Sequence, residues 1–198
     1  MTTTEEKRKR PSASEAVVYT QLTLPFSVPA DAAHIKALRE SIALQTEGEA
    51  VEVSEAYPTP LLMIAFDVAH QTSPEMILRL NSGERILLFD HRGVPALRDE
   101  DIYLINETAE HKESEQFIPE LTINLEAVWK KTGAAEDNPA VIESASAEVE
   151  KLTRPAMTTT LVGEAPALLF LLAQHSLYGK TGEIWYQEKA TSVPVRVK

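Results

Sequence analysis

The sequence contains no cysteine in its 198 residues. This absence excludes a disulfide-stabilised fold, a thiolate zinc site, an iron–sulfur cluster and a cysteine nucleophile. Long hydrophobic runs are missing too, because the longest, Ala165 to Ala173, is about half of the roughly 20 residues that a membrane-spanning helix needs. The first ten residues contain no apolar segment of the kind that secretory signals carry. We therefore expect a cytoplasmic protein.

Several catalytic motifs are also absent. The sequence holds no phosphate-binding loop (GxxxxGKS/T), dinucleotide fingerprint (GxGxxG), serine-hydrolase elbow (GxSxG) or metalloprotease motif (HExxH). Its five histidines never recur three or four residues apart, the spacing that places two metal ligands on one helix face. We expect no metal and no cofactor.

Positive charge is scarce outside the N-terminus. The chain has 19 Lys and Arg against 30 Asp and Glu, a net charge of −11, although residues 7–10 are all basic. An acidic body of this kind repels polyphosphate, so extended duplex nucleic acid is not an expected partner. Residues 1–15 are too polar to bury a core, and we interpret them as a disordered basic tail.

Hydrophobic periodicity predicts an α/β fold, in which residues 16–198 form a single domain with one mixed sheet. The C-terminal residues 156–198 are the clearest part: a strand, a helix apolar on all sides that must be buried, and a closing pair of strands. Strands are expected within 17–24, 50–55, 85–89, 102–105, 157–162, 184–186 and 193–197. Helices are expected within 31–44, 61–70, 140–152 and 167–178, with an amphipathic segment at 122–131 and a helix or turn starting at 73–75.

Asp90, His91 and Arg92 form the densest group of reactive side chains, directly after the predicted strand 85–89. Ligands of α/β sheets bind at strand ends, where an arginine can hold a phosphate while an imidazole or carboxylate moves a proton. These three residues are therefore the candidate catalytic group of a metal-independent phosphodiesterase. The same Asp-x-Arg-Gly sequence is also typical of an ordinary β-turn.

A phosphate ligand needs several cations. Besides Arg92, the candidates for ligand binding are Arg85, Arg98 and Lys180.

The C-terminal residues resemble a known family. Between Thr153 and Val197 the chain has a β-rich run, Gly163-x-x-Pro166, an apolar helix ending near a histidine, an apolar strand ending in Tyr186 and a closing β-rich strand. This order resembles CRISPR-associated accessory proteins that bind and degrade cyclic oligoadenylate messengers. The family's catalytic Asp-x-Arg after the tyrosine is not kept, and its histidine, expected near Tyr178, is missing. The resemblance therefore implies a copy of the site that binds without catalysis.

The two halves of the chain resemble each other. Pro60 to His70 is similar to Pro166 to His175, and each segment precedes an apolar strand. In the first half that strand ends in Asp90-x-Arg92, the pattern absent from the second half. An internal duplication is one interpretation.

Two functions remain open. The first is a prokaryotic defence accessory protein that recognises a cyclic oligonucleotide and binds it rather than degrading it efficiently. The second is a non-enzymatic acidic subunit or inhibitor that binds a basic protein, by nucleic-acid mimicry for example. The sequence leaves open whether the chain forms homo-oligomers.

Overall fold

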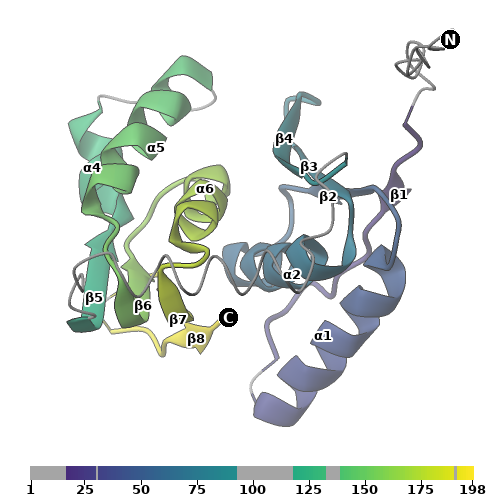
Figure 1. Ribbon diagram of the computed structural model, residues 1–198, viewed down its shortest axis with the longest axis horizontal. Coiled ribbons are helices and arrows are strands. Elements are labelled where there is room, and N and C mark those ends of the chain that lie inside the picture. Colours follow the sequence, from purple (N-terminus) through teal and green to yellow (C-terminus); the bar gives the residue numbers. More distant parts are fainter. Residues whose placement is uncertain (1–16, 30, 93–117, 133–138, 190) are drawn as a thin grey trace, which may run out of the picture.

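The computed structural model describes residues 17–29, 31–92, 118–132, 139–189 and 191–198. The described chain is an α/β protein with eight strands in two sheets and five helices (Figure 1). The expected tail 1–15, the expected strand 102–105 and Arg98 lie outside the described residues. None of the described helices is long and apolar enough to cross a membrane.

The first sheet contains the strands β1 (Thr20–Gln21), β2 (Val51–Ser54), β3 (Glu75–Arg79) and β4 (Arg85–Asp90), in this order. The first three strands are parallel, and β4 returns antiparallel to β3. Helix α1 (Ala32–Thr46) connects β1 to β2, and α2 (Thr59–Thr72) connects β2 to β3. The side chain of Asp31 caps α1 by accepting a 2.9 Å hydrogen bond from the backbone N–H of His34.

The second sheet contains β5 (Ile118–Asn124), β6 (Ala156–Val162), β7 (Thr181–Gln187) and β8 (Val195–Arg196), in this order. Again three parallel strands are followed by one antiparallel strand. Helices α4 (Leu125–Lys131) and α5 (Pro139–Leu152) lie between β5 and β6 in the sequence, and α6 (Ala167–Leu177) lies between β6 and β7.

The two halves therefore share one topology, and their strand registers agree. Val51 of β2 lies opposite Met76 of β3, and Thr159 of β6 lies opposite Ile184 of β7, so both partners are displaced by 108 positions. The helices α2 and α6 both follow an N-cap proline, Pro58 and Pro166, at the same displacement. The sequence similarity pairs Pro60 with Pro166, whereas in the structure the residue equivalent to Pro166 is Pro58, two positions earlier.

The expectation of one mixed sheet was wrong, because the strands divide into two. In Figure 1 the helices α2 and α6 lie between the two sheets, side by side at the centre of the molecule. Both helices are apolar on nearly every side, so each covers its own sheet and also packs against the other helix. The buried hydrophobic side chains of both halves form one contiguous core.

Two local expectations also failed. Residues 73–75 do not begin a helix. Glu75 is instead the first residue of the buried strand β3, and a short apolar run after Pro74 resembles a helix start in the sequence. Leu87 belongs to the apolar run 85–89 that predicts a core strand, yet its side chain is 53% exposed, so β4 is not buried along its whole length.

Candidate functional site

The predicted catalytic group does not converge on one point. Asp90 Oδ1 accepts hydrogen bonds from Arg92 N at 2.8 Å and Arg92 Nε at 3.0 Å, and Asp90 Oδ2 accepts one from Arg92 Nη2 at 3.0 Å. This pairing is the one by which an aspartate closes a turn on its own backbone. Arg92 holds the pKa of the Asp90 carboxyl below its ordinary value. The ring of His91 instead stacks on Phe89, 4.7 Å between centroids.

Arg92 and Arg85 are both bound to buried carboxylates of the first sheet. Arg92 Nη2 lies 2.7 Å from Oε2 of Glu75, whose other oxygen accepts a hydrogen bond from the Tyr19 hydroxyl. Arg85 Nη2 lies 2.6 Å from Oε2 of Glu52. Both glutamates are almost completely buried, so their charges need these partners. In this arrangement each guanidinium neutralises a buried carboxylate of the sheet.

The remaining predicted ligand residues do not join this network. Lys180 precedes β7 in the second half, and its Nζ donates a 3.0 Å hydrogen bond to Thr153 Oγ1. Arg98 lies outside the described residues. The structure thus brings Arg85 and Arg92 to one sheet and places Lys180 in the other half.

His91 belongs to an aromatic cluster at the junction of the halves. The ring of His70 lies 4.5 Å from that of His91 and 5.7 Å from that of His175, and it stacks on Tyr178 at 4.0 Å. The cluster consists of Phe66, His70, Phe89, His91, His175 and Tyr178. Among the described residues no group of side chains is suited to hold a metal ion.

Burial and the neighbouring imidazoles disfavour positive charge in this cluster. Desolvation, followed by the proximity of His91 and His175, lowers the pKa of His70 from 6.5 to about 4. Desolvation also lowers the pKa of His175. The sequence could not reveal the cluster, because its histidines come from α2, the end of β4 and α6.

The side chain of Asp67 in α2 ties the two halves together. The buried carboxylate accepts a 2.8 Å hydrogen bond from the Tyr178 hydroxyl and forms an ion pair with Arg39 of α1. Arg39 Nη1 also donates to the backbone oxygen of Val197 at 3.0 Å. Burial and the nearby carboxylate raise the pKa of Tyr178 far above its ordinary value.

A cavity of about 490 Å³ lies between the halves, at the carboxyl ends of their parallel strands. Glu55 follows β2, Asn81 follows β3, Glu164 follows β6, and Trp129 comes from α4, which begins where β5 ends. The cavity's other lining residues are Leu80, Ile142, Ala165, Pro166 and Leu168. Strand ends of this kind are where α/β proteins bind ligands. We call this hollow the inter-half cavity.

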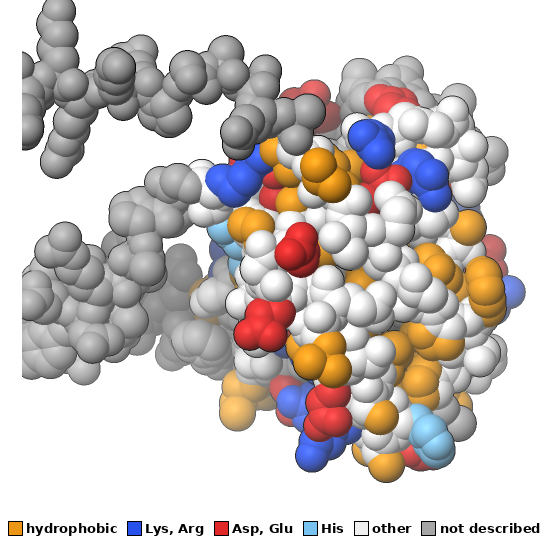
Figure 2. Space-filling view, turned by 90° about the vertical axis from the view of Figure 1, so that its right-hand side faces the viewer, with side chains coloured by type: hydrophobic (Ala, Val, Ile, Leu, Met, Phe, Trp, Pro, Cys, Tyr) orange, Lys and Arg blue, Asp and Glu red, His pale blue; other side chains and the backbone are white. Residues whose placement is uncertain are grey.

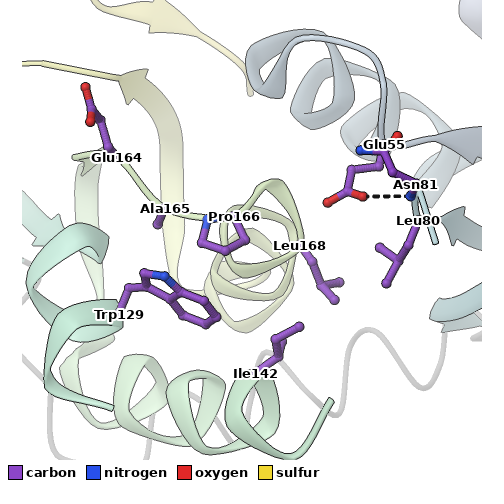
Figure 3. Close-up of a pocket in the computed structure, with 9 residues that line it drawn as sticks. All are labelled: Glu55, Leu80, Asn81, Trp129, Ile142, Glu164, Ala165, Pro166 and Leu168. Carbon is purple, nitrogen blue, oxygen red and sulfur yellow. Dashed lines mark hydrogen bonds between the residues drawn. The ribbon is translucent and has the colours of Figure 1, made fainter. Parts of the chain in front are cut away.

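The polar groups of the inter-half cavity stand at its two ends (Figure 3). Figure 3 shows Glu55 and Glu164 on opposite sides of a row of apolar side chains, with the Trp129 indole facing Pro166. Glu55 Oε2 accepts a 3.0 Å hydrogen bond from the backbone N–H of Asn81. Glu164 Oε1 lies 2.8 Å from Lys189 Nζ. The cavity therefore offers hydrogen-bond acceptors and an aromatic face.

Gly163 shapes the turn that presents Glu164. Its φ of +107° belongs to a region that residues with a side chain rarely adopt. A Cβ at this position would lie 2.6 Å from the Cβ of Glu126 on α4. The glycine thus lets the β6–α6 turn approach α4, which carries Trp129.

Most described lysines and arginines are neutralised by a neighbouring carboxylate. On the face shown in Figure 2, acidic and basic side chains lie beside one another and do not gather into a large patch of one sign. Among the described residues, several glutamates outside these ion pairs are exposed, including Glu47, Glu49 and Glu188.

No protein-family model, no curated protein and no solved structure shows significant similarity to this chain.

Proposed function

We propose that the protein binds a cyclic oligonucleotide messenger of the oligoadenylate class in the inter-half cavity, as an accessory protein of a prokaryotic defence system. The observation that carries this proposal is the position of the cavity, at the carboxyl ends of parallel strands from both repeats. Two similar halves around one hollow suit a ligand that is itself built from repeated nucleotides. The resemblance of the C-terminal residues to cyclic oligoadenylate-binding proteins supports the same ligand class.

The chemistry of the cavity favours bases over phosphates. An adenine is planar and can pack on the Trp129 indole, while its amino group can donate to the carboxylate of Glu55 or Glu164. The same carboxylates repel a phosphate. The bases therefore enter the cavity, and the phosphodiester groups stay in the solvent outside it.

Binding without efficient hydrolysis is the activity that we infer. Arg92 is held by Asp90 and Glu75, and His91 packs in the aromatic cluster. Any phosphodiesterase activity at Asp90, His91 and Arg92 would need Arg92 to leave a buried carboxylate. We further infer that the two halves form a single domain, because one hydrophobic core runs through both. We also infer that the protein acts in the cytoplasm.

Tryptophan fluorescence provides the test, since the chain has two tryptophans. In a Trp185→Phe variant, Trp129 becomes the only reporter, and cyclic tetra- or hexa-adenylate should quench it saturably. Cyclic tetra-uridylate is the matched ligand, because uracil lacks the amino donor. Glu55→Gln and Glu164→Gln should weaken binding by about tenfold, as expected for a lost hydrogen bond to a charged group.

The control variant is Glu120→Gln, an exposed glutamate outside the cavity lining. Absence of a calorimetric signal with every cyclic oligoadenylate tested would refute the proposal. Binding that Trp129→Leu leaves unchanged would place the ligand elsewhere.

The second candidate is an acidic subunit that binds a basic protein. It is favoured by the charge distribution, in which most described cations are already paired and surplus carboxylates face solvent. Co-purification of a basic partner that dissociates at high salt, from a protein that binds no cyclic oligonucleotide, would support this function.

A further inference from the structure

A second hollow lies on the second half, between the edge strand β5 and the helices α4 and α5. Its volume is about 480 Å³. Leu121 and Ile123 of β5, Val128 of α4 and Leu152 of α5 supply an apolar lining. Lys131, Glu148, Lys151 and Arg154 also line it. We call this hollow the basic groove.

The basic groove carries positive charge on an otherwise acidic protein. Lys131 Nζ lies 2.9 Å from Glu148 Oε2, and Lys151 Nζ lies 2.5 Å from Glu148 Oε1. The hydrogen bond from Lys151, which has the largest effect, and the one from Lys131 lower the pKa of Glu148 to about 2. The lining thus holds three cations and one carboxylate, in a chain whose net charge is −11.

Long stems let these cations serve a ligand in the groove. The side chains of Lys131 and Lys151 are 73% and 69% exposed, so their ammonium groups can turn from Glu148 to another anion at little cost. Arg154 is exposed as well and lines the same hollow. A guanidinium can hold a carboxylate through two parallel hydrogen bonds.

We propose that the basic groove binds a small amphiphilic anion, a carboxylate attached to an acyl chain. The apolar side chains of β5 and α4 take the chain, and Arg154 with the two lysines takes the carboxylate. Charge complementarity and an apolar lining are both required, because an inorganic anion would leave the apolar surface in contact with water. The site is separate from the inter-half cavity, and the inference is independent of the proposed function.

Calorimetric titration with decanoate, below its micellar concentration, tests the inference on the full chain. Saturable 1:1 binding is expected, with affinity lost for decanol, which has no charge, and for butyrate, which has a short chain. Arg154→Glu should weaken binding by about tenfold or more, since it removes a charge-assisted contact and adds a repulsive charge. Glu148→Gln should strengthen binding, because it frees both lysines from their competitor.

The matched control is Lys36→Glu, which makes the same charge reversal at an exposed lysine of α1, outside the groove lining. The control should retain the wild-type affinity for decanoate. Equal losses in Lys36→Glu and Arg154→Glu would overturn the inference, because they would show a response to overall charge only. Inorganic phosphate that competes as well as decanoate would also overturn it.

Discussion

Acidification should destabilise the protein through His70, whose ring lies between the halves. Because its pKa in the folded protein is about 4 instead of 6.5, the unfolded chain binds a proton between these pH values that the folded chain does not. The free energy of unfolding therefore falls as the pH falls from 6.5 to 4, and this contribution is constant below about pH 4. Above about pH 6.5 the imidazole is neutral in both the folded and the unfolded chain, and the loss is absent.

The magnitude follows from the same pKa difference. The full difference between 6.5 and about 4 corresponds to about 3 kcal/mol. His70 is only half-buried, so solvent screening reduces the effect, and we expect about 1 to 2 kcal/mol. Desolvation is the main cause of the shift, so the loss should change little with salt concentration.

Urea unfolding curves between pH 7.5 and 4 measure the effect in the wild type and in His70→Phe. The phenyl ring keeps the stacking on Tyr178 and cannot titrate, so the variant should lose less stability on acidification than the wild type. His34→Gln, at an exposed position on α1, is the control and should behave as the wild type does. Parallel pH profiles for His70→Phe and wild type would refute the reasoning.

Three further predictions concern stability. Leu171→Ala should lower the free energy of unfolding by about 2 to 5 kcal/mol, because Leu171 is completely buried in α6. Leu172→Ala should lower it clearly less, because Leu172 is only partly buried, and equal urea midpoints for the two variants would contradict this. Arg92→Ala should lower the urea midpoint in the same assay, since it leaves a buried carboxylate of β3 without its cation. An unchanged midpoint would show that the pair contributes nothing. Gly163→Ala should lower the melting temperature more than Gly48→Ala does. Both glycines have positive φ, but only Gly163 is crowded by α4. A larger fall in melting temperature for Gly48→Ala would be inconsistent with the described turn.

The sequence predicted the elements with strong periodicity. The apolar helix 167–178 and the strands around it are present as α6, β6 and β7, and the helix expected within 31–44 is present as α1. It missed β3, because a buried glutamate after Pro74 does not look like the start of a core strand. Glu75 is buried there only because Arg92 and Tyr19, distant in sequence, reach it.

The sites were harder to predict than the fold. Asp90, His91 and Arg92 are neighbours in sequence, but alternation along the chain sends the imidazole to one group and the guanidinium to another. The inter-half cavity depends on Trp129, Glu55 and Glu164, which are brought together only by the pairing of the two halves. No local pattern in the sequence signals this pairing.

The agreement of strand registers between the halves has a consequence for how the molecule can evolve. Two identical subunits related by a two-fold axis must accept every substitution twice. Two repeats fused in one chain are free of this constraint, and each can diverge alone. Here the second half has α4 and α5 between its first two strands, where the first half has α1. Trp129 and Ile142 of these helices line the cavity from the second half alone, so its two walls differ in chemistry although the strands behind them pair alike.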